Sequence, residues 1–314
     1  MNGDSRRHDE SPSGPSPRRI GPDRLEEAIR VLVRGDQKAA TRFLDYAATQ
    51  RLSLRHLWGS FDRHDRIASS VLVAPGAGRT AMVFASRPPT VEAAERLGTL
   101  LRTAVEELDP RQIALAQALV DPSDHREEAL FLAGGFRRLA ELDYLERPVP
   151  RFGAMSAGPS PEGMTTECWD PTDRDRLISL LVRTYENTLD CPGLAGLRRP
   201  EDILDGHLAS GSPVPEWWHI LRWNDEDAGV LLFNRGASPE TLELVYLGLT
   251  SAARGRGLGR ALLTHGLSLL DGDSARTIVL AVDRANHPAA ALYRRTGFRY
   301  AMRRIALVRP VTDT

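Results

Sequence analysis

The sequence predicts an α/β protein, of the α+β kind, in which one fold occurs twice in tandem. Each copy is expected to have a mixed central sheet with helices on both faces. Segments with the two-residue period of strands alternate with segments of helical period along the chain. A segment of the first half is repeated in the second half. The length of 314 residues also suits two domains of ordinary size.

Composition divides the chain into four parts. Residues 1–21 are polar and rich in Ser, Pro and Gly, which predicts a disordered tail. Residues 22–147 form the first copy and residues 164–314 the second. Between them, residues 148–163 hold prolines and glycines among small and polar residues, and we interpret this segment as a linker.

The first copy opens with two helical patterns, at residues 23–35 and 36–50, and Gly35 separates them. The elements expected after them are strands at 66–75 and 79–86, a helix at 91–108, a strand at 113–120, a helix at 125–133 and a strand at 136–146.

The second copy begins with a strand at 164–169 and a helix within 171–190, at whose start Pro171 stands. Period-two alternation in the next strand places Trp217 and Trp218 on opposite faces, so one of them is expected in the core. The expected elements after the first helix are a short helix within 200–211, strands at 216–223, 229–234 and 241–250, a helix at 257–270, a strand at 277–283, a helix at 288–296 and a strand at 298–308.

The repeat is visible without gaps. Residues 119–137, LVDPSDHREEALFLAGGFR, align with residues 281–299, AVDRANHPAAALYRRTGFR, at a constant offset of 162, and eight of the 19 positions are identical. Duplication explains this better than chance. Extending the offset sets residues of unlike chemistry opposite each other: Glu92 and Arg254, Glu95 and Gly257, Leu97 and Gly259, Phe131 and Tyr293, Asp124 and Asn286, and Ala81 and Glu243.

Charge and cysteine content narrow the class of protein. The chain has 41 basic and 42 acidic residues, so no overall field favours nucleic acid or an anionic membrane. No apolar run reaches the roughly 18 residues of a membrane span, and the N-terminus has no apolar signal core. Two cysteines, Cys168 and Cys191, are expected as free thiols in a reducing cytoplasm. His207 and His219 have no partner at metal spacing, so no metal is expected.

The segment LGLTSAARGRGLGRALL, residues 247–263, joins a strand to a helix through a loop of glycine and arginine. A helix start presents unpaired backbone N–H groups and a partial positive charge. Glycines let a ligand approach the backbone closely, and arginines add bidentate donors. The loop therefore predicts a diphosphate site. In the first copy, Glu92 and Glu95 would repel such a ligand, so that copy is expected to have lost the site.

Other interpretations of the loop remain open. It lacks the G-x-x-x-x-G-K-[ST] pattern of nucleoside triphosphate loops, and G-x-G-x-x-G fails because position 260 is Arg. Asp283, at the end of a later strand, keeps a dinucleotide or methyl-donor site possible. A glycine-rich turn on a solvated basic face is the purely structural alternative.

Two motifs resemble those of the GNAT superfamily of N-acyltransferases. The loop resembles its acyl-CoA motif, R/Q-x-x-G-x-G/A after an apolar strand, with Arg254, Gly257 and Gly259 at the required places. LAVDRANHPAAALYRRTGFR resembles its second motif of strand, Asn, Ala-rich helix, Tyr and Gly-Phe. The resemblance covers residues 164–310 and, through the repeat, extends more weakly to residues 22–147. The tandem layout is similar to that of the mycothiol synthase family, although the substrate-contacting parts show no specific match.

This resemblance implies acetyl transfer from acetyl-CoA, the co-substrate, to an amine. The amine must lose a proton, and a carboxylate can accept it. Glu243 matches the place of the base in some family members, and alternation puts it on one strand face with Val245, Leu247 and Leu249. Glu186 and Asp190 are rival bases, and an exposed strand glutamate is the structural alternative.

The resemblance also assigns the cofactor-binding residues. Backbone N–H groups around Leu247 and Leu249 would polarise the thioester carbonyl and pair with pantetheine. Tyr293 would protonate the leaving thiolate, unless it is only a core tyrosine, and Asn286 would bond the pantetheine arm. The phosphates would meet the loop itself: Arg254, Gly255, Arg256, Gly257, Leu258, Gly259 and Arg260.

The expected function is therefore acetyl transfer by the C-terminal copy to a small-molecule or peptide amine, without nucleic acid or membrane partners. The acidic residues Glu186, Asp190, Glu201 and Asp202 hint at a cationic amine, and a solvated charged loop explains them equally well. A CoA-binding protein without transfer activity is the alternative function, and an interaction module is a third. The first copy is expected to stabilise the second or to shape its pocket.

Overall fold

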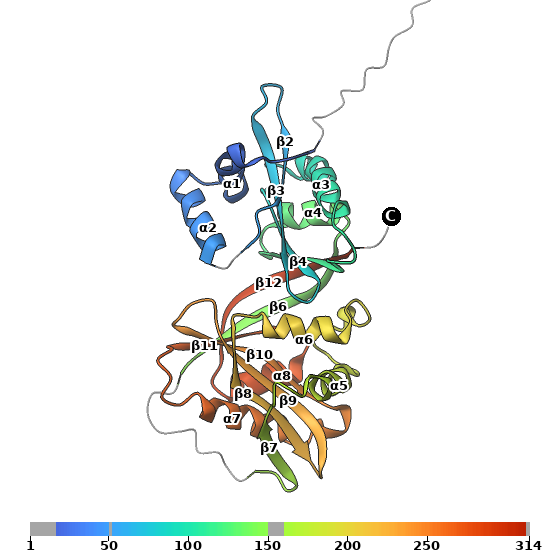
Figure 1. The fold of residues 1–314 in the computed structure, drawn as a ribbon, viewed down its shortest axis with the longest axis vertical. Coiled ribbons are helices and arrows are strands. Elements are labelled where there is room, and N and C mark those ends of the chain that lie inside the picture. The colour runs from blue at the N-terminus through green and yellow to red at the C-terminus, as the bar shows by residue number, and fades with distance from the viewer. Residues whose placement is uncertain (1–16, 50–51, 150–159, 312–314) are drawn as a thin grey trace, which may run out of the picture.

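The computed structural model describes residues 17–49, 52–149 and 160–311 (Figure 1). The first half contains β1 (Arg18–Arg19), α1 (Leu25–Val33), α2 (Gln37–Thr49), β2 (His56–Phe61), β3 (Ile67–Gly76), β4 (Thr80–Ala85), α3 (Val91–Glu106), β5 (Leu115–Val120), α4 (His125–Ala133) and β6 (Arg137–Pro148).

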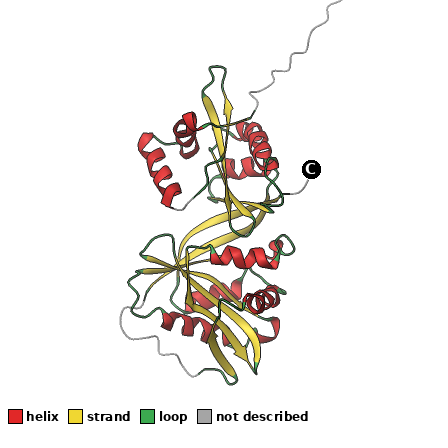
Figure 2. Cartoon of the chain, in the orientation of Figure 1, coloured by secondary structure: helices red, strands yellow, loops and turns green. Residues whose placement is uncertain are grey.

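The second half contains β7 (Met164–Cys168), α5 (Arg174–Tyr185), α6 (Pro200–Leu208), β8 (Ser212–Trp223), β9 (Glu226–Arg235), β10 (Thr241–Leu249), α7 (Leu258–Leu269), β11 (Thr277–Asp283), α8 (His287–Arg295) and β12 (Arg299–Pro310). Short 3-10 turns lie at Pro22–Arg24, Pro192–Leu194 and Ser251–Ala253. Helices and strands alternate through both halves (Figure 2), which confirms the expected mixed α/β fold.

One sheet of 12 strands runs through both halves, in the order β1-β2-β3-β4-β5-β12-β6-β11-β10-β9-β8-β7. The two halves exchange their last strands within it. β12, from the end of the chain, lies between β5 and β6, and β6, from the first half, lies between β12 and β11. The long β6 and β12 strands join the two halves in Figure 1. Each half therefore needs a strand of the other to complete its sheet.

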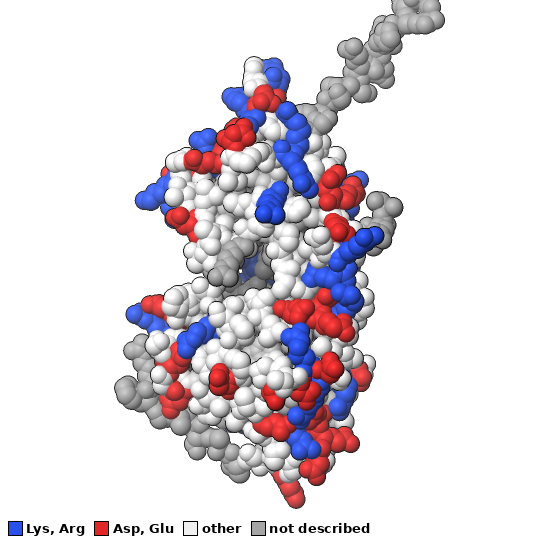
Figure 3. Space-filling view, viewed as in Figure 1, with Lys and Arg blue, Asp and Glu red and all other residues white. Residues whose placement is uncertain are grey.

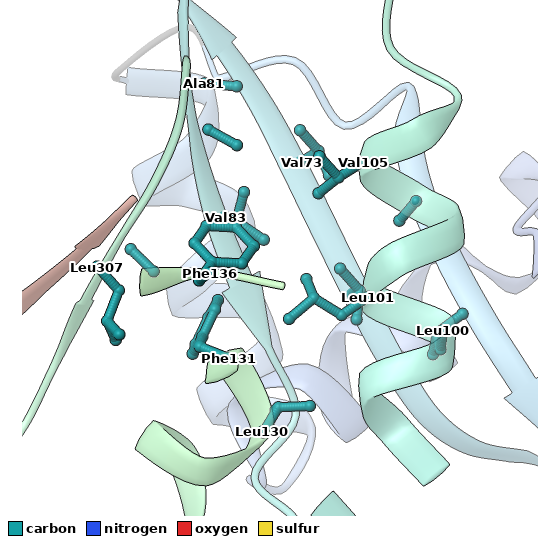
Figure 4. Close-up of a cluster of buried hydrophobic side chains, with 14 of the residues drawn as sticks. Val73, Ala81, Val83, Leu100, Leu101, Val105, Leu130, Phe131, Phe136 and Leu307 are labelled. Atoms are coloured by element: carbon teal, nitrogen blue, oxygen red, sulfur yellow. The ribbon is translucent and has the colours of Figure 1, made fainter. Parts of the chain in front are cut away.

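The hydrophobic clusters reflect this exchange. The cluster under α3 and α4 includes Ile305 and Leu307 of β12, and Figure 4 shows Leu307 beside Phe131 and Phe136. The cluster under α7 and α8 includes Leu145 and Val149 from the first half. Separate clusters lie under α1 with α2 and under α5 with α6, so helices cover both faces of each half of the sheet.

The structure describes parts of the expected tail and linker. Within the tail expected over residues 1–21, Arg18–Arg19 form β1 and pair with β2, so the expectation of disorder is wrong for residues 17–21. Residues 1–16 and most of the expected linker, residues 150–159, lie outside the described residues. Strand β2 was not expected, because Gly59 and Ser60 interrupt its apolar alternation.

The repeat is preserved in three dimensions. Phe131 packs edge-on against Phe136 with ring centroids 5.1 Å apart, and Tyr293 packs against Phe298 in the same manner at 5.8 Å. The side chain of Asp124 accepts a hydrogen bond from the N–H of Glu127 at the start of α4. Asn286 caps α8 identically, three residues before Ala289. These matches at the 162-residue offset support duplication of one fold.

The surface and the thiols agree with the composition. Basic and acidic side chains are interspersed over the face drawn in Figure 3. Both cysteines are free, as expected. Among the described helices, none combines the length and the apolar character needed to cross a bilayer. Within the same residues, no group of three or more His, Cys, Asp or Glu side chains is arranged to hold a metal ion.

Candidate active site

The candidate site begins where β10 and β11 separate. These parallel strands pair only over Thr241–Glu243, opposite Thr277–Val279. On its other edge, β10 stays paired with β9 as far as Leu249. The edge of β10 from Leu244 to Leu249 that faces β11 therefore has no ladder partner. It is open for an extended ligand to pair with it.

A β-bulge between Leu244 and Tyr246 changes the faces of β10. Leu244, Leu247 and Leu249 pack toward the α7 cluster, whereas Val245 and Tyr246 pack toward the α5 cluster. The expectation that Glu243 shares a face with Leu247 and Leu249 is therefore wrong. The extra residue at the bulge reverses the alternation that a regular strand would keep.

Glu243 lies in a partly buried polar niche. Its Oε2 accepts a hydrogen bond from the Ser210 hydroxyl at 2.9 Å. Burial raises the pKa of Glu243, and the Ser210 bond partly opposes this rise. Burial raises the pKa of Tyr144 on β6, and the charge of Glu243 raises the Tyr144 pKa further, so the two side chains lie near each other. The first half thus contributes a side chain to the surroundings of the expected base.

The glycine loop has the backbone of an anion site. Gly255 and Gly257 adopt φ of +74° and +79°, which favour glycine, and nothing lies within 4 Å of a Cβ built on either. Within the described residues, the N–H groups of residues 255–259 have no backbone acceptor, and α7 begins at Leu258. Unpaired donors, open space and a helix start fit the phosphates of a nucleotide.

The three arginines of the loop differ in their contacts. The Arg254 guanidinium donates to the carbonyls of Leu249, Asn187 and Thr184 at 3.1, 2.9 and 2.8 Å. It is therefore engaged in joining the loop to the end of α5. Arg256 lies over the Trp223 ring at 4.7 Å. Within the described part of the chain, Arg260 forms no hydrogen bond or ion pair and is exposed.

Other expected cofactor residues have structural roles as well. Leu258 is buried in the α7 cluster, so only its backbone faces the loop. The side-chain Oδ1 of Asn286 accepts from the N–H of Ala289, and within the described residues its NH₂ group has no partner and is left for a ligand. A Cβ built on Gly259 would lie 3.5 Å from Cδ1 of Leu249 and 3.7 Å from Cδ2 of Leu292, so Gly259 lies close to both side chains.

Tyr293 is buried on α8 and faces the same region. Burial raises the pKa of its phenol, with Asp190 and Tyr246 as smaller contributors. The phenol therefore stays protonated at neutral pH, and within the described residues no hydrogen bond occupies it. A protonated, unengaged hydroxyl is what a proton donor requires.

The rival bases differ in their surroundings. Asp190 is partly buried, which raises its pKa, and its Oδ1 accepts the N–H of Asp283 at 2.9 Å. It lies near Tyr293 and remains a second candidate base. Glu186 contributes only its carbonyl, which accepts the Ser251 hydroxyl at 3.3 Å.

One of the four acidic residues that suggested a cationic acceptor amine is paired with arginines of the protein itself. Asp202 is buried and paired with Arg199 at 3.1 Å and with Arg79 at 3.6 Å. Arg199 is the nearer partner, and because Arg79 belongs to the β3–β4 turn, the first half adds to the neutralisation of this charge. Trp218 is fully buried, which confirms one tryptophan in the core, while Trp217 lies under Arg235.

Sequence reasoning missed an aromatic group beside the site. Tyr246 stacks on Tyr185 at 5.2 Å, and the Tyr246 hydroxyl bonds that of Thr184 at 2.8 Å. His207 packs on the same ring, and burial lowers its pKa to about 3, so it is neutral. The bulge, which sequence did not show, turns Tyr246 toward this group.

In the first half the corresponding site is closed. α3 begins at Val91, so Glu92 and Glu95 lie within a helix where the second half has its glycine loop. α3 packs directly on α4, and a Cβ on Gly98 would lie 2.7 Å from the Cβ of Ala133. α7 and α8 hardly contact each other. The expected loss of the phosphate site in the first copy agrees with this packing.

The strand registers also correct one expected pair. In the first half, the parallel contact of β4 and β5 covers Thr80–Met82, and β4 has no bulge. Met82 is the last paired residue there, as Glu243 is in β10. Glu243 therefore corresponds to Met82, not Ala81, because the bulge adds one residue to β10.

The family match lies in the second half of the chain. Residues 181–298 match the model of the acetyltransferase (GNAT) family. The chain is similar to mycothiol acetyltransferases of Actinosynnema mirum (25% identity over 87% of this chain and 84% of that protein) and Salinispora arenicola (32% over 54% and 55%). A further one, from Corynebacterium glutamicum, is 39% identical over 30% of this chain and 34% of its own. The chain thus spans about a third of the Corynebacterium protein and about half of the Salinispora one.

Solved structures share the whole fold. A GCN5-related N-acetyltransferase from Sphaerobacter thermophilus superposes with a TM-score of 0.58 at 19% identity, covering 95% of this chain and 97% of its own. A tandem GNAT protein from the clavulanic acid biosynthesis pathway gives 0.52 at 15%, with coverage of 95% and 98%. At these identities the likeness shows the fold, including its tandem form.

Proposed function

We propose that this chain, whose second half matches the acetyltransferase (GNAT) family, transfers the acetyl group of acetyl-CoA to an amine. The second half performs the transfer, and the first half supports it. The acceptor is a small-molecule or peptide amine. The two free thiols agree with a reducing compartment, and we propose a cytoplasmic location.

The contrast between the two halves carries this proposal. The two halves share one fold, yet among the described residues only the second combines an open glycine loop, helices that stand apart and a bulge in the strand before that loop. In the first half, an earlier helix start and the contact of Gly98 with Ala133 occupy the same places. Features retained in one copy and lost in the other point to a ligand that needs them.

The residues of the second half can perform the proton transfers. Acetyl-CoA supplies the activated acetyl thioester. Glu243 accepts the proton of the attacking amine, directly or through water, as the new C–N bond forms. As the C–S bond breaks, the Tyr293 phenol donates its proton to the leaving sulfur. Backbone N–H groups on the open edge of β10 stabilise the charge that develops on the carbonyl oxygen.

The donor would be held by backbone rather than by side-chain charge. The N–H groups of residues 255–259 would receive the phosphates, with Arg260 as the available guanidinium. Arg254 would act indirectly, by holding the loop against the end of α5. The NH₂ group of Asn286 would meet the pantetheine arm.

Calorimetric titration with acetyl-CoA tests the proposal, using Gly257→Glu and a matched control, Gly272→Glu. Gly272 has φ of +80° and open space around it, so both variants impose the same backbone strain. One site per chain, lost in Gly257→Glu and kept in Gly272→Glu, is the expected result. Two sites per chain would assign a working site to the first half, and no binding would overturn the enzyme assignment.

An amine panel follows the titration. Acetyl-CoA consumption that depends on an added amine supports transfer. Tight binding of acetyl-CoA without transfer to any amine would favour the alternative, a CoA-binding protein without catalytic activity.

A further inference from the structure

A separate cavity of about 870 Å³ lies in the first half. It is bounded by the first turns of α3, the end of α1, the neighbouring ends of β2 and β3, and the segment that follows β4. Its size falls within the range of sites for small organic ligands. The α3 residues that line it face β2 and β3. It differs from the counterpart of the acetyl-CoA site in this half, which is closed by the packing of α3 on α4 at Gly98.

The two halves differ in the side chains beside this cavity. In the second half, Leu249 fills the space between β9 and α7, and a Cβ built on Gly229 would lie 2.5 Å from its Cδ2. The residue 162 positions earlier is Arg87, which forms an ion pair with Asp124 instead. With Ser60 and Ser69 on the neighbouring strands, the corresponding space in the first half is left open.

The charge of the lining selects the ligand. All charged residues that line the cavity are arginines, namely Arg34, Arg87 and Arg96, and none is acidic. Arg87 is neutralised by Asp124. Arg96 forms no ion pair within the described part of the chain, although its charge helps to lower the pKa of Glu92, one turn earlier on α3. Guanidinium groups bind carboxylates and phosphates through two parallel hydrogen bonds.

Arg34 reaches the cavity from the end of α1. It ends α1 with φ of +49°, a left-handed conformation that non-glycine residues seldom adopt. Its guanidinium donates to the carbonyl of Arg87, which also lines the cavity. A left-handed residue is a common way for a helix to end, so the position of Arg34 at the cavity rests on its bond to the Arg87 carbonyl.

From these contacts, we propose that the first half binds a small organic anion, a carboxylate or phosphate ester with an apolar body. Arg34 and Arg96 receive its anionic group. The hydroxyl groups of Ser60 and Ser69 bond each other at the cavity wall, and Leu97 and Leu100 of α3 contact the apolar body. The site is independent of the proposed acetyl transfer and lies in the other half of the chain.

Calorimetry of the full chain tests this site with benzoate and phenyl phosphate as probes. Benzyl alcohol is the uncharged control, and inorganic phosphate shows whether the apolar body is needed. We expect one site per chain for an organic anion, with benzyl alcohol and inorganic phosphate each bound about tenfold more weakly or worse. Equal binding of benzyl alcohol, or no binding of either anion, would overturn the proposal.

Two variants locate the bound anion. Arg96→Glu reverses the exposed charge, and Ser69→Leu fills the cavity without changing charge, so each should weaken binding about tenfold or more. Arg42→Glu, an exposed charge reversal on α2 away from the cavity, should leave binding unchanged. Gly257→Glu should also leave it unchanged. If Gly257→Glu or added acetyl-CoA removes the anion, or if Arg96→Glu and Ser69→Leu do not weaken it, the assigned site is wrong.

Discussion

The Ser210 hydroxyl donates to Oε2 of Glu243 across 2.9 Å, from the loop after α6 to the last residue of β10 that pairs with β11. The bond fixes one carboxylate oxygen and leaves the other for a substrate. It also favours the ionised form, against the burial that raises the pKa of Glu243. This pair therefore sets the pH range over which the proposed base can act.

Acetyl transfer should fall as pH decreases through the raised pKa of Glu243, because the protonated carboxyl cannot accept a proton. Ser210→Ala removes a bond that lowers this pKa, so the acid limb of the pH–rate profile should move to higher pH. Ser212→Ala, which changes an exposed serine on β8, is the control.

Glu243→Gln should lower kcat about 10²- to 10⁴-fold without weakening acetyl-CoA binding. If Glu243→Gln keeps full activity, Asp190→Asn becomes the variant to measure.

Tyr293→Phe should lower kcat roughly 10²-fold while Tm stays near that of the parent. The ring would remain against Phe298, as Phe131 lies against Phe136 in the first half, and only the hydroxyl would be lost. Steady-state kinetics and a thermal melt measure the two quantities. Tyr300→Phe, on an exposed tyrosine, controls for loss of a phenol elsewhere. A lower Tm with unchanged kcat would make Tyr293 a core residue.

Arg254→Gln should mainly lower stability, whereas Arg260→Gln should mainly weaken acetyl-CoA binding. Removing the three bonds from Arg254 to carbonyl groups should cost about 2–3 kcal/mol of unfolding free energy. Arg260→Gln should leave stability unchanged and weaken acetyl-CoA binding, since its side chain is exposed and unengaged within the described residues. Urea unfolding and calorimetry separate the two effects. The reverse pattern would mean that Arg254, not Arg260, meets the phosphates.

A fragment of residues 160–314 should fail to fold as a soluble monomer. Without β6, the edge of β11 is unpaired, and the α7 cluster loses Leu145 and Val149. Circular dichroism and size-exclusion chromatography show the outcome, and co-expression with residues 1–159 should restore the fold. A fragment that folds and turns over substrate normally would remove any structural role for the first half.

The sequence predicted most local structure because each signal was local. Apolar periodicity and the glycine loop before α7 located elements of the second half, although Asp173, and not Pro171, lies at the start of α5. The repeat revealed the duplication, because identical side chains pack identically around Phe131 and Tyr293.

Three features of the structure were beyond sequence reasoning. The bulge after Leu244 leaves no compositional mark, so strict alternation misassigned the faces of Leu247 and Leu249. The strand exchange depends on pairing between residues more than 100 positions apart, as for Tyr144 and Ala281. The engagement of Arg254 by carbonyl groups likewise follows from tertiary contacts with α5.

The exchanged strands also set an order for synthesis. The first half cannot finish its sheet until β12, residues Arg299–Pro310, has left the ribosome, although β5 is made some 180 residues earlier. Until then, one edge of β5 and the apolar side chains that Ile305 and Leu307 later cover stay exposed. The two halves, though copies of one fold, therefore mature together, and a stop codon shortly before Arg299 would leave both of them unfinished.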